Sequence, residues 1–217
     1  GRALSFSGDR PGLEMAWPPI QVLTAISLDG EADCISLGDV IDLRGTAFTI
    51  EFWYRREALD RSDLILSHGD ESGEALRNLA VGFLRDNRFA FSFLGHSLDT
   101  PQAYTDLDWH HYAVTFQPQS RAIYRDGVLV CEAPSPTGYD GVGRICIGRV
   151  VTKSGTLFGK GCIDRVRVWK IARSPGSIAA DFRTPTLPPA SGLVAQWTFD
   201  CDAAKWDLTG AGAQRAV

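Results

Sequence analysis

Histidines and turn carboxylates are the first residues of this chain whose side chains could do chemistry. His110 and His111 are adjacent, and imidazoles serve as metal ligands or catalytic bases. They lie in an expected strand, where neighbouring side chains point to opposite faces, so we predict a structural role for both. His68, Asp70 and His96 stand beside turn residues. They are candidate ligand-binding residues at the rim of the fold, although solvated loop side chains are the commoner alternative.

Aromatic residues outside the strands could form a platform for a sugar ring. Trp17, Tyr104 and Tyr139 lie in expected loops and join the candidate ligand-binding residues. The alternative is that these rings pack onto an edge of the fold and bury apolar area there. The tryptophans of the strands are expected in the core: Trp53, Trp109, Trp169 and Trp197.

Catalysis requires more than isolated carboxylates. Glycoside hydrolysis needs two carboxyl groups at a controlled separation, about 5 to 5.5 Å in retaining enzymes. Glu51 stands alone on its strand, with Thr49 and Trp53 as same-face neighbours. Asp106 and Asp108 alternate only in an expected loop, and no Gly-x-Ser-x-Gly segment marks a nucleophilic serine. We therefore predict no catalytic residue and expect a binding module rather than an enzyme.

The five cysteines contain no Cys-x-x-Cys pair, so a structural zinc site is not predicted. Their odd number leaves at least one thiol free or paired outside the chain. Each cysteine is either a small buried hydrophobic residue or a disulfide partner, and the sequence does not decide between these interpretations. The cysteines therefore do not identify the redox compartment. They are Cys34, Cys131, Cys146, Cys162 and Cys201.

Composition limits the class of protein further. The 217 residues include 22 Lys and Arg against 26 Asp and Glu, which gives a formal net charge of −4. This balance provides no electrostatic footprint for nucleic acid or an anionic membrane. No apolar run approaches the roughly 20 residues of a transmembrane helix, and no apolar segment of the signal-peptide type follows the first residues. We expect a mature or excised globular chain with no nucleic-acid partner and no membrane insertion.

Short strands separated by turns must position these residues. The segment 48–54 is rich in β-branched and aromatic residues, and the runs 109–116, 121–125 and 128–131 predict a meander. Asp126-Gly127, between the last two runs, favours a type I′ turn. The regular short spacing predicts an all-β fold, a jelly-roll β sandwich of two antiparallel sheets.

A single short helix is expected near residues 174–182. Ser174 can cap it, and Pro175 suits its first position because the missing N–H has no helical partner there. The proline-rich segment 184–189 then ends regular structure. A last strand is expected over 193–199.

Several motifs occur in an order that resembles a known family. They are Ala25–Gly30 (AISLDG), Phe48–Trp53 (FTIEFW), Trp109–Phe116 (WHHYAVTF), Tyr124–Gly127 (YRDG), Ile147-Gly148, Gly161–Trp169 (GCIDRVRVW) and Ala172–Ser174 (ARS). Over about residues 24 to 200 the chain resembles the laminin-G-like, concanavalin-A-like jelly rolls. That superfamily includes lectins, adhesion modules, pentraxins and glycosidases, so the resemblance implies the fold more strongly than the function. Its glycosidases carry an acidic run such as Glu-x-Asp-x-x-Glu on one strand, and this chain lacks such a run.

The resemblance also implies that early and late strands lie close together. Asp29 and Asp33, in an acidic turn, could then share one structural Ca²⁺ with Asp164 and backbone carbonyls, since Ca²⁺ takes about six to eight oxygen ligands. The alternative is that Asp29 only forms the turn and Asp164 is a buried hydrogen-bond acceptor. No other cofactor is expected.

The expected organisation is one jelly roll over residues 24–200, a leading segment over 1–23 and a C-terminal tail over 201–217. The segment 3–9 resembles 25–31, so the leading segment is either an extra edge strand or a seam between modules. The expected function is non-catalytic recognition or adhesion, with a glycan or a protein surface as ligand. The resemblance implies a module of a larger secreted or cell-surface protein with neighbouring domains. The alternatives are a structural spacer of a multidomain protein or toxin and, least favoured, a glycoside hydrolase of the same fold.

Overall fold

Alternating burial along the strands explains why this chain forms two packed sheets. In β3 (Phe48–Arg56), the side chains of Phe48, Ile50 and Phe52 belong to one buried hydrophobic cluster. Successive side chains of a strand point to opposite faces, so Glu51 lies on the other side of the same sheet. This strand therefore has a core face and an outer face.

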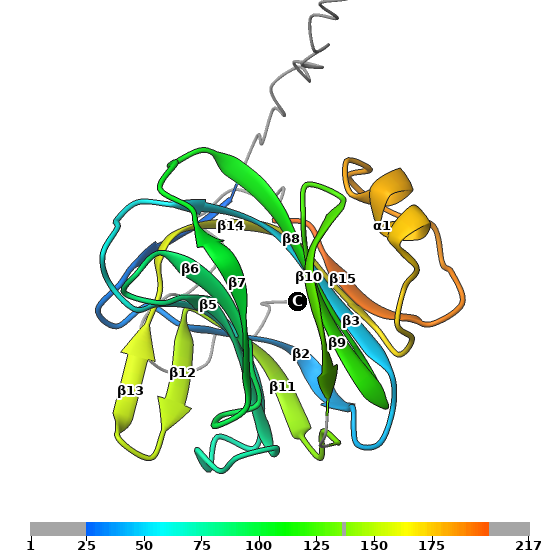
Figure 1. Cartoon of the computed structure of the whole chain (residues 1–217), viewed down its shortest axis with the longest axis horizontal. Helices are drawn as coiled ribbons and strands as arrows, with labels where there is room; N and C mark the ends of the chain where they lie inside the picture. The colour runs from blue at the N-terminus through cyan, green and yellow to red at the C-terminus, as the bar shows by residue number, and fades with distance from the viewer. Residues whose placement is uncertain (1–24, 136–137, 200–217) are drawn as a thin grey trace, which may run out of the picture.

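The computed structural model describes residues 25–135 and 138–199 (Figure 1). Besides β3, the first sheet contains β1 (Ile26–Asp29), β8 (Trp109–Gln117), β9 (Gln119–Arg125), β10 (Val128–Ser135), β14 (Lys160–Trp169) and β15 (Leu193–Trp197). The second sheet contains β2 (Ile35–Asp42), β4 (Asp63–Gly69), β5 (Asn78–Phe83), β6 (Arg88–Ser92), β7 (Ser97–Ala103) and β11 (Val142–Ile147). A separate hairpin consists of β12 (Arg149–Thr152) and β13 (Gly155–Phe158).

The order of the strands confirms the predicted jelly-roll β sandwich. The first sheet has the order β1-β14-β3-β8-β9-β10, and β15 also pairs with β14. The second has the order β2-β11-β4-β5-β6-β7. Pairing is antiparallel in both, and the buried cluster draws side chains from both sheets. The strand patterns do not predict β7 or the β12–β13 hairpin.

Local turn chemistry also agrees with the expectation. Asp126 and Gly127 join β9 to β10 and have φ angles of 52° and 78°, as a type I′ turn requires. Glycine adopts such angles without strain, whereas other residue types do so rarely. The predicted meander of β8, β9 and β10 is therefore confirmed.

The predicted helix is confirmed as α1 (Pro175–Asp181). Ser174 caps it, and its hydroxyl oxygen accepts a hydrogen bond from the backbone N–H of Ser177 at 3.1 Å. Ile178 packs against Ala113, Ala122 and Tyr124, which lie on the outer face of the first sheet. The helix therefore covers part of that face, at the side of the sandwich (Figure 1). Among the described residues, no helix is long and apolar enough to cross a membrane.

The predicted leading segment (1–23) and tail (201–217) lie outside the described residues, which begin at Ala25 and end at Phe199. The predicted domain boundaries therefore stay a prediction.

Candidate functional site

The predicted ligand-binding residues do not converge on one surface. His68 lies inside β4 and Tyr139 in the chain before β11, and both are only 1% exposed. The imidazole Nε2 of His68 donates to the carbonyl of Ile41 at 2.9 Å, and its Nδ1 lies 2.8 Å from the Tyr139 hydroxyl. Burial lowers the pKa of His68, so the ring is neutral. Tyr139 lies in a loop, as predicted, and His68 lies in a strand, but neither side chain reaches the rim of the fold, because long-range contacts bury both.

The remaining predicted ligand-binding residues apart from Asp70 are Tyr104, His96 and Trp17. Tyr104 is buried and its ring stacks beneath the guanidinium of Arg125, whose Cζ lies 4.2 Å from the ring centroid. It is therefore not an open platform, which corrects the prediction for this residue. His96 is exposed, as expected, and its backbone carbonyl accepts from Arg121 at 2.6 Å. Trp17 lies outside the described residues.

Asp70 is the predicted ligand-binding residue that lines a hollow. The hollow has a volume of about 210 Å³ and lies where β2, β4, β5 and β11 end or begin. We name it the loop-end hollow, and its lining residues are Arg44, Asp70, Arg77, Asp140 and Val142. Each of its charged residues comes from a loop or from the chain next to a strand end, which the sheet holds in place.

The charges of the loop-end hollow are paired but open to water. Arg77 contacts Asp70 at 2.6 Å, and their side chains are 53% and 29% exposed. Asp70 also accepts from the amide of Asn78 and the backbone N–H of Ser72. Hydrogen bonds from Ser72, first that of its hydroxyl, and from Asn78, together with the nearby guanidinium of Arg77, lower the pKa of Asp70. The hollow therefore presents an ionised carboxylate and planar guanidinium groups to solvent.

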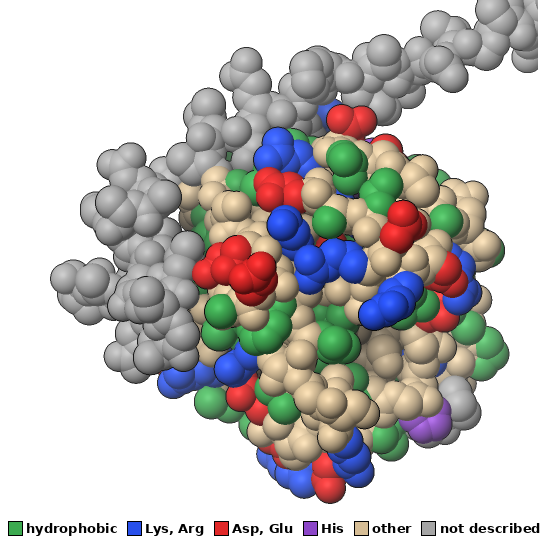
Figure 2. All heavy atoms as spheres, turned by 90° about the vertical axis from the view of Figure 1, so that its left-hand side faces the viewer, with side chains coloured by type: hydrophobic (Ala, Val, Ile, Leu, Met, Phe, Trp, Pro, Cys, Tyr) green, Lys and Arg blue, Asp and Glu red, His purple; other side chains and the backbone are tan. Residues whose placement is uncertain are grey.

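The outer face of the second sheet is only partly exposed, because Cys146, Ser67 and Ala80 are buried. One row of small side chains crosses all of its strands in register: Ser36, Cys146, Ser67, Ala80, Ser92 and Ser97. The β12–β13 hairpin packs at one side of this row, because Ser67 donates to the carbonyl of Arg149 at 2.8 Å. Figure 2 shows Lys and Arg side chains mixed with Asp and Glu over the side of the molecule that it draws. No large region of one charge is visible on this side.

The predicted calcium ligands do not form one site. Asp29 uses Oδ1 to accept from the backbone N–H groups of Glu31, Ala32 and Asp33, at 2.8 to 3.2 Å. The carboxylate of Asp33 in turn accepts from the N–H of Asp29 at 2.9 Å. These hydrogen bonds lower the pKa of Asp29. Both carboxylates therefore shape the turn, which is the alternative left open above.

Asp164 lies too far along the sheet to join that turn. β1 places Asp29 opposite Lys160, four positions before Asp164 on β14, which corresponds to about 13 Å. Asp164 is buried and accepts from the N–H of Arg165 at 2.8 Å. Among the residues that the structure describes, no group of three or more His, Cys, Asp or Glu side chains could hold a metal ion. Asp29, Asp33 and Asp164 are therefore not brought together as one site, and calcium binding by the chain stays a prediction.

A buried polar network surrounds Glu51, which is an isolated carboxylate in the sequence analysis. Its side chain is 0% exposed and contacts Arg173 at 2.7 Å and His111 at 3.3 Å. Arg173 also pairs with Asp181 of α1 and donates to the carbonyl of Ser177. Burial opposes ionisation of Glu51, but the hydrogen bond of His111 and the charge of Arg173 lower its pKa to about 2.

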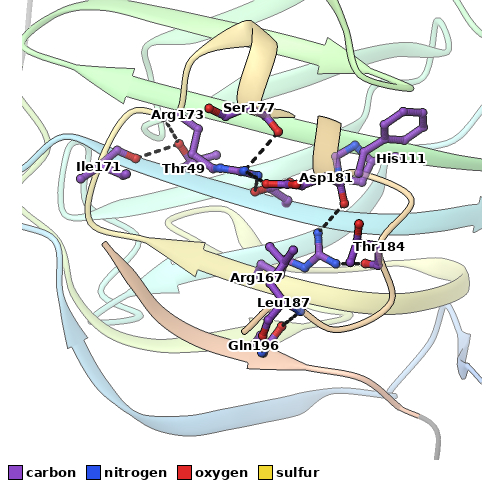
Figure 3. A network of polar contacts seen from close by, with 12 residues as sticks. Thr49, His111, Arg167, Ile171, Arg173, Ser177, Asp181, Thr184, Leu187 and Gln196 are labelled. Carbon is purple, nitrogen blue, oxygen red and sulfur yellow. Dashed lines mark hydrogen bonds and ion pairs between the residues drawn. The ribbon is translucent and has the colours of Figure 1, made fainter. Parts of the chain in front are cut away.

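A second arginine extends this network beneath the helix. Arg167 of β14 donates to the carbonyls of Asp181, Thr184 and Pro185, and so fixes the chain that follows α1 (Figure 3). Trp53 donates to the carbonyl of Phe182 at 3.0 Å. We name the set of Glu51, His111, Arg167, Arg173 and Asp181 the helix-anchoring network. Its members other than Asp181 are buried, and their contacts hold α1 and the chain after it against the first sheet, which agrees with the structural role predicted for His111.

One signal in the sequence could have indicated this network. Glu51 stands in an otherwise apolar and aromatic strand, and a buried carboxylate needs a partner. The partner, Arg173, is 122 residues away. Nothing local to either residue identifies the pair.

Comparisons with known proteins agree with this architecture. A family model described as the concanavalin A-like lectin/glucanases superfamily matches residues 29–179. Pappalysin-1 of Mus musculus is 24% identical over 211 residues, which cover 87% of this chain but only 13% of that protein. The chain thus spans a small part of this relative.

Solved structures share the fold at low sequence identity. A carbohydrate-binding protein from Bacteroides ovatus, itself described as putative, has a TM-score of 0.63 at 17% identity, over 87% of this chain and 60% of that one. The CBM40 of a Ruminococcus gnavus sialidase, bound to α2,3-sialyllactose, has a TM-score of 0.54 at 14% identity, over 72% and 94% of the two chains. The β sandwich, its strand order and the matched family model together show that the chain belongs to the concanavalin A-like lectin/glucanase superfamily.

Proposed function

We propose that this chain is a non-catalytic recognition module that binds a glycan at the loop-end hollow. The observation that carries the proposal is the pair formed by Asp70 and Arg77, at the wall of a concave site and open to solvent. A carboxylate accepts hydrogen bonds from sugar hydroxyls, and a guanidinium donates several in one plane. The volume of about 210 Å³ suits one terminal ring rather than a long oligosaccharide.

The energetics of the pair favour exchange with a ligand. An exposed ion pair contributes only about 0 to 1 kcal/mol, so a ligand can replace its contacts at small cost. The fold neighbours also support the proposal, because one is a binding module with sialyllactose bound. That ligand belongs to the neighbour, and the sugar bound by this chain is left to experiment.

The state of the carboxylates supports binding over hydrolysis. A glycosidase needs one carboxyl group that stays protonated until it transfers its proton. The pKa of Asp70 is lowered, and Glu51 is closed off by α1. Neither group is suited to act as the acid.

We also propose that the chain works outside the cell, as a module of a larger secreted or cell-surface protein. The family and the small share of Pappalysin-1 that it spans support this context. Protein ligands and neighbouring domains would then be reached by other surfaces.

A glycan array with the whole chain tests the proposal. We expect a defined set of hits, and for a hit we expect Arg77→Gln and Asp70→Asn each to weaken binding at least about tenfold, because each removes charged hydrogen bonds. Arg88→Gln is the matched control. Arg88 forms a similar exposed pair with Asp86, at 2.7 Å, outside the hollow. Its binding should change less than about twofold.

Three outcomes would contradict the proposal. An array without hits, together with no affinity for extracellular proteins, would favour the structural spacer. Equal loss of binding in Arg88→Gln and Arg77→Gln would place the site elsewhere. Release of reducing sugar from a bound oligosaccharide would show an enzyme.

A further inference from the structure

A second concave site lies between β2 and β15, which are edge strands of different sheets. Its volume is about 480 Å³, within the range of about 300 to 1,000 Å³ that is usual for ligand sites. We name it the edge groove. Its lining residues are Gly38, Asp39, Val40, Ile41, Asp42, Lys170, Val194, Ala195, Gln196 and Trp197.

The two walls of the edge groove run in opposite directions. At one end Gly38 lies against the indole of Trp197, since a Cβ added to this glycine would come within 2.9 Å of the ring. At the other end lies Asp42, whose pKa is lowered to about 2 by its partner Arg44 and, to a smaller extent, by the nearby charge of Lys170. The groove therefore has a closed end at Trp197 and an end lined by charges.

A bulge in β2 shapes the groove. The pairing with β11 passes from Leu37 opposite Ile145 to Ile41 opposite Gly143, so the residues between them leave the ladder. Val40, one of these residues, is 60% exposed. Such bulges re-aim side chains and protect an edge from further pairing. The edge of β2 is therefore blocked.

The edge of β15 has no such protection. Edge strands are commonly guarded by charges or proline, and the other edges of the two large sheets follow this rule. The guarding residues are Asp29 in β1, Asp39 and Asp42 in β2, Asp99 and Pro101 in β7, and Glu132 and Pro134 in β10.

β15 contains only Leu, Val, Ala, Gln and Trp, and among the described residues it pairs with β14 alone. Its Val194 is 45% exposed. An uncharged strand edge with an exposed aliphatic side chain is a template for one more strand. The edge groove lies beside it and offers room for that strand.

Two unpaired charges define what kind of strand would fit. Within the described part of the chain, the carboxylate of Asp39 and the ammonium of Lys170 make no hydrogen bond or ion pair, and both line the groove. Asp39 lies next to Gly38, at the end closed by Trp197, and Lys170 lies at the end near Asp42. The groove thus has a negative and a positive group towards opposite ends.

We propose that the edge groove binds an extended peptide segment of another protein, which adds a strand antiparallel to β15. Main-chain hydrogen bonds to the free edge give affinity, and alternate side chains give specificity. The segment carries a basic residue near its N-terminal end, facing Asp39, and an acidic residue near its C-terminal end, facing Lys170. Aliphatic residues between them contact Val40 and Val194. The groove lies next to the proposed glycan site, because Asp42 of the groove pairs with Arg44 of the loop-end hollow, but the peptide contacts proposed for the groove use neither of these residues.

The test uses the whole chain and two capped synthetic hexapeptides of identical composition. The first is Lys-Thr-Val-Thr-Val-Glu and the second is Glu-Thr-Val-Thr-Val-Lys. We expect the first to bind about fivefold or more tightly than the second, since each exposed charge contact contributes up to about 1 kcal/mol. We also expect the first peptide to slow hydrogen exchange of the β15 amides that face away from β14, which form the free edge. A ligand that contacts side chains alone would not protect these amides.

Matched variants locate the binding. Val194→Lys places a charge on the β15 edge and should weaken binding of the first peptide about tenfold or more. Val128→Lys is the control, because Val128 is an exposed valine, 66% exposed, at the start of another edge strand, β10. Val194→Lys should leave glycan binding unchanged, so the two proposals fail separately.

Several results would overturn the inference. Equal binding of the two peptides would do so, as would no binding at millimolar peptide. Protection, in the isolated chain, of those β15 amides that face away from β14 would show that the groove is filled by the chain's own ends or, if protection rises with concentration, by a second copy. Equal weakening by Val128→Lys and Val194→Lys would show a nonspecific charge effect.

Discussion

The helix-anchoring network and the loop-end hollow contain the same residue types, but these residues have different roles in the two places. Both pair arginine with carboxylates at similar distances, 2.7 Å for Arg173 and Glu51 and 2.6 Å for Arg77 and Asp70. In the network the partners are almost fully buried, whereas in the hollow they are open to water. Burial makes the first pair indispensable to the fold, because a buried charge without its partner is costly. Exposure makes the second pair weak and exchangeable.

The difference shows that residue type alone does not identify a binding residue. The exposure of the charged side chain decides whether a ligand can reach it. Glu51 is the more strongly perturbed carboxylate, yet each of its partners belongs to the structure that holds α1 on the sheet. Asp70 is perturbed less and remains accessible. For Glu51 the strong pKa shift comes from the contacts that anchor the helix.

The largest effect is expected from breaking the buried pair. Glu51→Gln leaves Arg173 buried without its counter-ion, so we expect the free energy of unfolding to fall by about 3 to 5 kcal/mol. For a domain of this size the melting temperature should fall by roughly 6 to 20 °C. Thermal and urea unfolding measure both quantities. Glu71→Gln, which removes the exposed partner of Arg149, is the control, and a similar loss there would show that burial is not the cause.

Acid should weaken the same pair in the wild-type chain. The pKa of Glu51 is about 2 in the folded chain against 4.5 as its ordinary value. Because the folded pKa is depressed, the stabilisation is present above about pH 4.5 and is lost as the pH falls towards 2, and it amounts to about 3 kcal/mol. Urea unfolding between pH 5 and pH 2 measures this loss. The free energy of unfolding should fall less steeply with pH in Glu51→Gln than in the wild-type chain. Equal slopes would exclude Glu51 as the source of the acid sensitivity.

The smallest effect is expected at the exposed pair. Arg77→Gln should change the free energy of unfolding by less than about 1 kcal/mol, because the solvated pair contributes little to folding. Its effect should instead be on glycan binding. Differential scanning calorimetry under the conditions of the binding assay checks this separation. A loss of stability above about 2 kcal/mol would mean that Arg77 supports the loop rather than the ligand.

The parts of the molecule that sequence predicts are those set by local chemistry. Ser174 and Pro175 mark a helix start, and Asp126-Gly127 marks a hairpin turn, because each acts through its immediate neighbours. The resemblance adds the jelly-roll arrangement of two sheets. These signals together are sufficient for the fold class.

The candidate sites depend on contacts that no local pattern contains. His68 and Tyr139 meet across 71 residues, so turn residues beside His68 could not show that both are buried. The expected nearness of two strands predicts a ligand set that includes Asp29 and Asp164, but the register of β1 on β14 places these two residues apart. The register of two strands is fixed by the packing of whole faces, and a shift of one residue reverses every side chain. Predictions of shared ligands therefore fail more easily than predictions of elements.

The position of β14 has a mechanical consequence. Ile26 pairs with Ile163 and Trp197 pairs with Val166, so both ends of the described sandwich attach to the same strand within three residues, or about 10 Å. A pulling force applied between Ala25 and Thr198 would enter and leave through this short piece of β14. The second sheet and the loops around Asp70 lie outside that path. A force applied between these two points is thus carried by the first sheet, while the loops around Asp70 keep their geometry.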